Sequence, residues 1–225
     1  AYNKACEALR NGKQAMVFVH SRKDTVKTAK QLAEFAAAQD GMELFSNNQH
    51  ERKAEFAQQV SRSRNNELKD LFLKGLGCHN AGMLRADRSL TEKLFAAGLI
   101  KVLVCTATLA WGVNLPAHMV VIKGTQLYDP QRGGFRNLGV LDVQQIFGRA
   151  GRPGFDTSGE GVIVTEHKNL AHYVSMLTHS TPIESQFVSN LADNLNAEVT
   201  LGTVTNVREG AQWLSYSYLH TRMEQ

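Results

Sequence analysis

Two arginines and a glutamine stand among glycines in the segment QQIFGRAGRPGFDTSGEG, which begins at residue 144. Gln145, Arg149 and Arg152 occupy the point where a helical pattern gives way to a glycine-rich turn. Arginine is permanently charged, and its planar donors fit phosphate oxygens in pairs. The spacing therefore predicts two guanidinium groups presented from a helix end toward a phosphate chain. The alternative is that the arginines only satisfy the last carbonyl groups of their own helix.

The order of elements in this segment is the reverse of a P-loop. A P-loop runs from strand to glycines to helix, whereas here a helix precedes the glycines and a strand follows them. The 225 residues contain no G-x-x-x-x-G-K-[ST] motif, and no Asp-Glu pair follows a strand to hold magnesium. Gly148 and Gly151 are thus expected to keep the surroundings of the arginines open while another surface holds the nucleotide. This hypothesis requires both guanidinium groups to lie at the carboxyl edge of the sheet, outside local salt bridges.

Further polar residues follow two apolar runs. Thr106 and Thr108 come after the run at 101–105, and Ser21 and Arg22 follow the run at 15–19. Hydroxyl groups and free backbone N–H groups at the carboxyl ends of strands are where α/β sheets bind ligands, and such donors commonly hold nucleic-acid phosphates. A helix N-cap is the plainer role for each of these residues.

The elements that must position these residues alternate along the chain. Helical patterns separate apolar runs that are rich in β-branched residues, at 15–19, 101–105, 119–123 and 161–165. Strands that are apolar throughout and separated by helices are typical of a parallel sheet covered on both faces. We therefore predict an α/β fold with a doubly wound parallel sheet.

The pattern changes near residue 180, where a proline is followed by short helical pieces. The sequence indicates one domain over 1–180 and the beginning of a second, mainly helical module over 181–225. Both ends of the sequence look like cuts through a longer polypeptide.

The composition is that of an ordinary globular protein, with 43% hydrophobic residues, 20% charged residues and a net charge of +4. This charge is compatible with a polyanionic partner but too small to indicate one. The longest apolar runs are far shorter than the ~20 residues of a membrane span, so no membrane association is expected. Cys6, Cys78 and Cys105 have no metal-ligand spacing, which predicts a reducing compartment and no metal site.

Three segments together resemble motifs IV, V and VI of superfamily 2 helicases of the superkiller type. They are VFVHSR (17–22), TATLAWGVNLPA (106–117) and the arginine segment that begins at 144. The sequence from residue 183 onward resembles the start of the winged-helix domain that follows in this branch. The chain is most similar to two-cassette DExH helicases, and more to the type found in a signal-cointegrator complex than to the spliceosomal type. Where the family usually has His-His-Ala-Gly, this chain has Asn80 in place of the second histidine.

The resemblance implies the second RecA-like domain of a helicase cassette with 3′-to-5′ polarity. ATP and Mg²⁺ would be held mainly by a first RecA-like domain of the same polypeptide. Gln145 would orient the attacking water or touch the γ-phosphate, and Arg149 and Arg152 would contact the phosphates. The further residues implied in ATP binding are Gly112, Asn114 and Gly148.

The resemblance also implies partners. The expected nucleic-acid partner is single-stranded or partly duplex RNA or DNA, and a multi-subunit complex in the nucleus and cytosol is expected as well. The residues implied in holding the tracked strand are Ser21, Arg22, His79, Thr106 and Thr108. His79 reads equally well as a packed or capping histidine.

The stretch QLYDPQRGGFRNLG (126–139) has turn residues between two short arms, which predicts a β-hairpin. The resemblance implies that this is a strand-separating hairpin, with Tyr128, Arg132 and Phe135 at its end. Aromatic rings there could stack on bases. The alternative is a surface loop with incidental aromatic residues.

Two other functions are compatible with the sequence. The first is a catalytically silent cassette that acts as a scaffold or regulator, although Gln145, Arg149 and Arg152 are all present. The second is a simple RNA-binding module, which the small net charge and the lack of a recognisable RNA-binding motif disfavour.

Overall fold

The structure is a computed structural model of the whole chain. It describes residues 1–129, 133–152, 154, 156–178 and 184–224, without the side chains of residues 108 and 111. Arg132 of the predicted hairpin and the side chain of Thr108 therefore lie outside the described residues.

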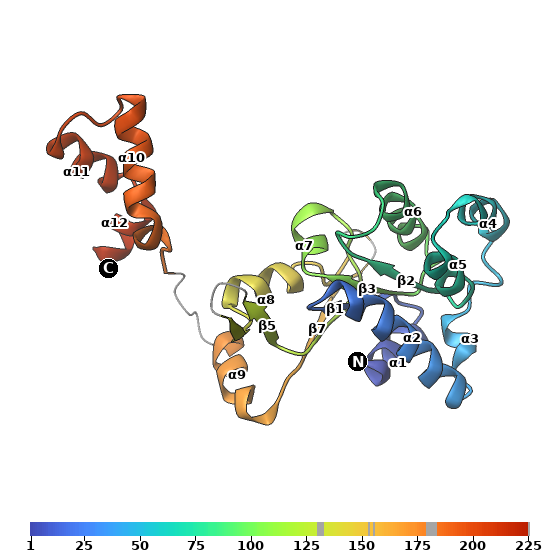
Figure 1. Cartoon of the computed structure of the whole chain (residues 1–225). Helices are drawn as coiled ribbons and strands as arrows, with labels where there is room; N and C mark the ends of the chain where they lie inside the picture. The colour runs from blue at the N-terminus through green and yellow to red at the C-terminus, as the bar shows by residue number, and fades with distance from the viewer. Residues whose placement is uncertain (130–132, 153, 155, 179–183, 225) are drawn as a thin grey trace. The chain divides into compact units, whose positions relative to one another are not determined.

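A parallel sheet of five strands forms the centre of the first part of the chain (Figure 1). The strand order is β2-β3-β1-β4-β7. The strands are β1 (Ala15–Val19), β2 (Leu76–His79), β3 (Val102–Thr106), β4 (Met119–Lys123) and β7 (Glu160–Val164). The predicted α/β class is confirmed, and the strands predicted at 101–105 and 161–165 are each displaced by one residue.

The strands are apolar throughout because both faces of the sheet are covered. All five residues of β1 are buried. Ala15, Val17 and Val19 belong to a core cluster with residues of α1 (Tyr2–Arg10) and α2 (Arg22–Ala38). Met16 and Phe18 point to the opposite face and are also fully buried. Figure 1 shows α6, α7 and α8 on that other side of the sheet.

The remaining helices of this part of the chain are short. They are α3 (Met42–Phe45), α4 (Lys53–Arg62), α5 (Asn66–Leu73), α6 (Arg85–Ala96), α7 (Thr108–Gly112), α8 (Val140–Phe147), the 3₁₀ turn η1 (His167–Asn169) and α9 (Leu170–Thr178). The predicted cap of α2 is confirmed, since the Ser21 hydroxyl accepts a hydrogen bond from the Asp24 backbone N–H at 3.1 Å.

The predicted β-hairpin forms from β5 (Gln126–Asp129) and β6 (Gly134–Asn137). The two strands are antiparallel, with Tyr128 opposite Phe135. They make a separate two-stranded sheet between β4 and α8 in the chain.

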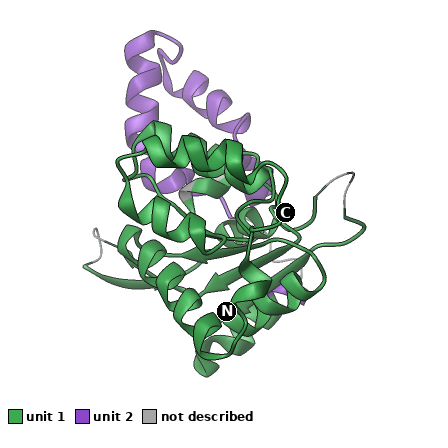
Figure 2. Ribbon diagram, turned by 90° about the vertical axis from the view of Figure 1, so that its right-hand side faces the viewer, with its two compact units in different colours: residues 1–175 green, residues 176–225 purple. Residues whose placement is uncertain are grey.

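Residues 1–175 form one compact unit, and residues 176–225 form a second (Figure 2). The second unit contains η2 (Phe187–Asn190), α10 (Leu191–Leu201), α11 (Val207–Ser215) and α12 (Tyr218–Met223). Gly202 ends α10 in the left-handed conformation, with φ 78°, and Asn206 caps α11. Phe187 packs on Trp213 with ring centroids 5.4 Å apart. In the described ranges, no helix has the length and apolar composition of a membrane span.

Candidate nucleotide and nucleic-acid site

The end of α8 brings Gln145 and Arg149 to one acceptor. Gln145 Nε2 donates to the Ala110 carbonyl oxygen at 3.2 Å, and Arg149 Nη2 donates to the same oxygen. Arg149 Nη1 donates to Asn114 Oδ1 at 3.3 Å. The two side chains reach the same oxygen because they lie one helical turn apart. Gln145, Arg149 and Asn114, which we assigned to one nucleotide site, are thus neighbours.

Backbone contacts hold the two segments that carry these residues together. The Ala117 N–H donates to the Arg149 carbonyl at 2.9 Å, and the Gly151 N–H donates to the Ala117 carbonyl at 2.7 Å. Gly151 has a φ of 88°, which glycine adopts without strain. Gly159 also packs closely, since a Cβ atom there would lie 2.5 Å from the backbone nitrogen of Gly151. The segment that follows α8 is therefore fixed by its backbone as well as by side chains.

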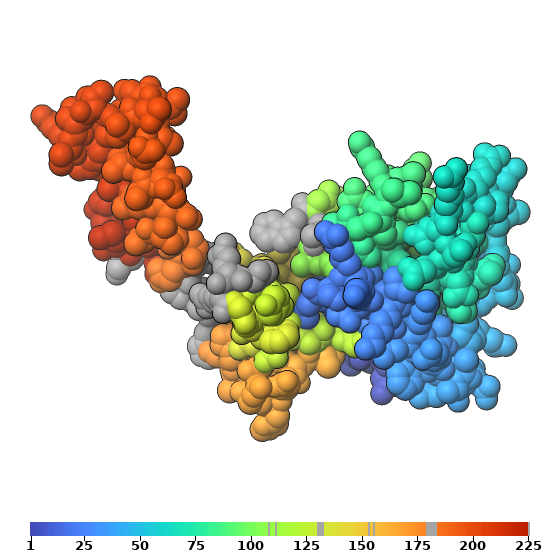
Figure 3. All heavy atoms as spheres, viewed as in Figure 1, coloured from blue at the N-terminus to red at the C-terminus, as the bar shows by residue number. Residues whose placement is uncertain are grey.

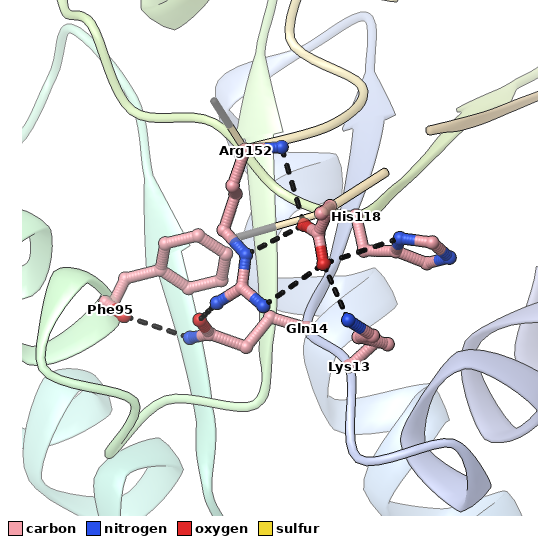
Figure 4. Close-up of polar contacts among 6 residues, drawn as sticks. Lys13, Gln14, Phe95, His118 and Arg152 are labelled. Atoms are coloured by element: carbon pink, nitrogen blue, oxygen red, sulfur yellow. Dashed lines mark hydrogen bonds and ion pairs between the residues drawn. The ribbon is translucent and has the colours of Figure 1, made fainter. Parts of the chain in front are cut away.

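Arg152 has a different setting from Arg149. Its Nε donates to Asp156 Oδ2 at 2.9 Å, its Nη2 to Asp156 Oδ1 at 3.4 Å, and its Nη1 to Gln14 Oε1 at 3.2 Å (Figure 4). Its backbone N–H also donates to Asp156 Oδ2, at 3.2 Å. The expectation that Arg152 stands outside local salt bridges is therefore wrong for this chain by itself.

Arg152 also lies at the amino edge of the sheet, not at the predicted carboxyl edge. Its partner Gln14 directly precedes β1, and the Gln14 amide donates to the carbonyl of Ile100, which lies just before β3, at 2.7 Å. The connection from β4 through α8 to β7 explains why Arg152 lies at the amino edge. The chain leaves the carboxyl end of β4 and must return to the amino edge to enter β7 as a parallel strand, so the residues after α8 arrive there.

The Asp156 carboxylate is the centre of a buried charge cluster. Its side chain is 0% exposed, and Lys13 Nζ donates to Oδ1 at 2.6 Å. His118 Nδ1 lies 3.7 Å from the same oxygen. The hydrogen bond from Arg152 is the largest cause that holds the pKa of Asp156 well below its usual range, and the bond from Lys13 acts in the same direction. The carboxylate is thus ionised at neutral pH and compensated by cations on two separate segments.

At the carboxyl edge of the sheet, Ser21 and Arg22 are exposed. The Ser21 hydroxyl is partly used locally, because it donates to Asp24 Oδ2 at 2.7 Å while it caps α2. Arg22 lines a groove between α2, α5 and the loop after β2, together with Lys27, Lys30, Arg64 and Asn80. Figure 3 shows this region where the blue surface of α2 adjoins the teal and green surfaces of α5 and α6. Thr106, the last residue of β3, is half-buried.

His79 is buried, with 3% of its surface exposed. Its Nε2 lies 2.7 Å from Glu92 Oε1. Asn80 is buried as well; its amide donates to the Thr25 hydroxyl at 2.9 Å, and its oxygen accepts from the Gly82 backbone N–H at 2.9 Å. These contacts favour the packed role for His79 over contact with nucleic acid.

The hairpin exposes its two aromatic side chains. Tyr128 is 61% exposed and Phe135 is 72% exposed, although their rings meet edge to face with centroids 5.6 Å apart. Arg136 Nη1 on β6 lies 3.7 Å from Asp142 Oδ2 of α8. Exposed paired aromatics at the end of a short ribbon form a surface on which a base could stack.

The donors near Ala110 fit the oxygens of a triphosphate but not a metal ion. Arg149 and Gln145 supply N–H groups, whereas Mg²⁺ prefers carboxylate and water oxygens. Among the described residues, no group of three or more His, Cys, Asp or Glu side chains could hold a metal. Of the glycines assigned to this site, Gly112 is exposed at the end of α7 and Gly148 follows α8 directly.

Comparison with known proteins decides the family. The family of the helicase conserved C-terminal domain matches residues 36–154, which is more than half of the chain. The chain belongs to this helicase family. A winged helix-turn-helix domain matches residues 184–225. The α/β domain is therefore followed by a winged-helix domain, as the motifs predicted.

Individual relatives agree with this assignment. The chain is 60% identical over 99% of its length to DExH-box ATP-dependent RNA helicase DExH14 of Arabidopsis thaliana. It is 56% identical over 99% of its length to activating signal cointegrator 1 complex subunit 3 of Homo sapiens, and 54% identical over 100% to that of Dictyostelium discoideum. These identities over the whole chain are consistent with a superkiller-type DExH helicase. The chain spans 10% of the length of each of these three relatives.

The sequence analysis missed three residues of the site, Lys13, Gln14 and Asp156. Asp156 lies four residues after Arg152, and that spacing was the one available signal. Gln14 lies 138 residues from Arg152 and could be found only once the order of the strands was known.

Proposed function

We propose that this chain is the C-terminal half of the motor of an ATP-dependent nucleic-acid helicase. The observation that carries the proposal is the convergence of Gln145, Arg149 and Asn114 around the Ala110 carbonyl. It occurs in a chain that is 60% identical to a protein named as an ATP-dependent RNA helicase. A first RecA-like domain of the same polypeptide would hold ATP and Mg²⁺.

The chemistry assigned to these residues is electrostatic. When bound, ATP supplies the phosphoanhydride bond whose hydrolysis drives the motor. Arg149 would exchange the neutral acceptors Ala110 and Asn114 for phosphate oxygens, which form stronger, charge-assisted hydrogen bonds with a guanidinium group. Gln145, which shares the Ala110 carbonyl with Arg149, would hold the attacking water or the terminal phosphate. An arginine that acts in this way increases the rate by about 10³- to 10⁵-fold in related nucleotide hydrolases.

The nucleic acid would bind at the opposite edge of the sheet. Ser21 and Arg22 follow β1 at the carboxyl edge, while Gln14 and its partner Arg152 lie at the amino edge. The five residues of β1 separate these edges by about 16 Å at 3.3 Å per residue. A rigid sheet of this length could transmit closure around a nucleotide into movement of the strand-binding edge. The groove beside Arg22 is lined by more basic than acidic side chains, which would favour a phosphate backbone.

The hairpin would separate the strands of a duplex. Tyr128 and Phe135 are its exposed aromatic residues, and each could stack on a base at the junction. The human relative is by its name a subunit of a complex, and we extend this to the present chain, with RNA or DNA as its nucleic-acid partner.

One observation favours a second candidate function, a catalytically silent cassette that acts as a scaffold. Arg152, the second of the two predicted phosphate contacts, is engaged by Asp156 and Gln14 within the chain. If neither arginine reaches a nucleotide, the same fold would bind nucleic acid or partner proteins without turnover.

The two functions are separated by Arg149→Ala in a cassette where a first RecA-like domain precedes this chain. We expect ATP turnover to fall by about 10³-fold, because the guanidinium group contributes only while charge develops on the phosphates. Single-strand affinity should be unchanged, because the Arg149 guanidinium group binds Ala110 and Asn114, which are not among the residues assigned to the strand. Arg10→Ala, which removes an exposed arginine of α1, serves as the control and should keep turnover. A wild-type cassette that binds nucleic acid without ATP turnover would support the scaffold, whereas equal, measurable turnover in both proteins would remove Arg149 from the reaction.

A further inference from the structure

Asp156 is the most completely buried charged side chain in the neighbourhood of the proposed nucleotide site. It accepts hydrogen bonds from Lys13 Nζ, from the Arg152 backbone N–H and from two guanidinium nitrogens of Arg152. Its carboxylate is 0% exposed, whereas the Arg152 side chain is 26% exposed. The carboxylate therefore cannot meet a nucleotide, whereas part of the Arg152 side chain that it holds is accessible.

Gln14 fixes the other side of the same guanidinium group. Its amide nitrogen donates to the carbonyls of Phe95 and Ile100, at 2.8 and 2.7 Å, so its oxygen faces Arg152 in a fixed orientation (Figure 4). Gln14 is buried, with 7% of its surface exposed. Arg152 is thus bound by two acceptors whose own positions are set by the core of the domain.

These contacts bear on whether Arg152 stays paired with Asp156 when a nucleotide binds or must leave Asp156 to reach it. If Arg152 left Asp156 in every cycle, a fully buried carboxylate would lose its closest guanidinium partner while the rest of the site stayed closed. Such a loss is strongly unfavourable in a buried environment. Retention of the pair while the accessible part of the Arg152 side chain meets a phosphate avoids that loss. The geometry therefore favours a fixed Arg152 over one that swings.

We propose that Asp156 is a positioning residue for Arg152, which it holds, together with Gln14, at the orientation required for contact with the nucleotide. This inference rests on the proposed function, because it assigns Asp156 an effect on turnover that passes only through Arg152. Lys13 belongs to the arrangement as the second cation on the carboxylate, and it ties the loop before β1 to the segment after α8.

The test is a double-mutant cycle with Asp156→Asn and Arg152→Lys in the cassette described above, with nucleic-acid-stimulated kcat as the readout. Asp156→Asn keeps the size of the side chain but removes its charge and one acceptor oxygen. We expect it to lower kcat by about 10- to 100-fold, the effect of a small displacement of a reacting group. In the Arg152→Lys background, the same change should alter kcat by less than about twofold, because the group that Asp156 positions is already gone.

A purely structural role gives a different result, because lost stability reduces the amount of active enzyme equally in both backgrounds. Asp87→Asn, which removes a buried carboxylate bound to the Ser63 hydroxyl, is the matched control and should show no dependence on background. If Asp156→Asn does not fold, Asp156→Glu keeps the charge and displaces it by one methylene group, with the same expected loss of kcat.

Three outcomes would overturn the inference: a wild-type kcat for the Asp156 variants, a kcat above wild type, or a loss that is equal in both backgrounds. A raised kcat would mean that Asp156 holds Arg152 back. The proposed function has a separate point of failure, since a normal kcat for Arg152→Lys alone would remove Arg152 from the reaction whatever Asp156 does.

Discussion

At the scale of the residue, the two arginines of one motif have opposite environments. Arg149 donates to neutral acceptors, Ala110 and Asn114, whereas Arg152 is paired with a buried carboxylate. A guanidinium group loses little free energy when it exchanges neutral partners for phosphate. When it leaves a buried carboxylate, the free-energy cost is large. The residues that matter for Arg152 are therefore those that hold it.

Removal of the Asp156 charge should destabilise the first unit of the chain. We expect Asp156→Asn to lower the free energy of unfolding by about 1 to 3 kcal/mol at neutral pH, since it breaks ion pairs to a buried carboxylate but leaves cations that are partly exposed to water. Urea denaturation of the two proteins at the same pH measures this difference.

The pH dependence follows from the lowered pKa of Asp156, whose carboxylate faces Arg152, Lys13 and His118. A carboxyl group with a depressed pKa in the folded state contributes its full stability above its unfolded pKa, about 4, and loses it as the pH falls further. The difference between wild type and Asp156→Asn should be constant from pH 5 to 7 and shrink below pH 4. A difference that grows on acidification would contradict the assignment.

At this scale the sequence predicts some contacts and not others. The i, i+4 spacing of Gln145 and Arg149 places both on one side of a helix end, and the structure joins them at one carbonyl. The setting of Arg152 depends on Gln14, which is far away in the sequence, and on Asp156, which lies four residues after Arg152 and outside the helices and strands of the domain. Contacts of that kind arise from the assembled sheet and leave no periodic pattern.

At the scale of the element, the strands are predicted well because they are buried on both faces. The runs at 15–19 and 119–123 coincide with β1 and β4. The charged stretch at 51–74 contains two helices, because α4 ends at Arg62 and Asn65 caps α5 by accepting hydrogen bonds from the backbone N–H groups of Glu67 and Leu68. Asparagine accepts such bonds readily at a helix start, so a polar pair within an apolar pattern divides it.

The hairpin is the element with the most specific expected effect. Deletion of 129–134 removes its turn and the connection between Tyr128 and Phe135, but leaves the five-stranded sheet in place. In the full cassette, ATP hydrolysis should continue while duplex separation falls by at least about tenfold, because the stacking surface is lost. Both rates can be measured in one reaction with a labelled duplex. Unchanged separation of the duplex would leave β5 and β6 as a surface loop with incidental aromatics.

At the scale of the whole molecule, the central feature is that one sheet carries different groups at its two edges. The amino edge holds the cluster of Arg152 with Gln14 and Asp156, and the carboxyl edge carries Ser21 and Arg22. The parallel arrangement of the strands separates these two groups of residues. The sequence predicted a parallel sheet from the alternation of strands and helices, but it did not predict the order of the strands. The same topology explains why Arg152 lies at the amino edge of the sheet and not at the predicted carboxyl edge.

If the proposed function holds, Gln145, Arg149 and Arg152 complete a nucleotide site whose other half is a first RecA-like domain. The most direct measurement is nucleic-acid-stimulated ATP turnover by the 225-residue chain, alone and joined to such a domain. We expect negligible turnover by the chain alone and stimulated turnover when the two are joined. Stimulated turnover by the chain alone, at the rate of the joined protein, would contradict it.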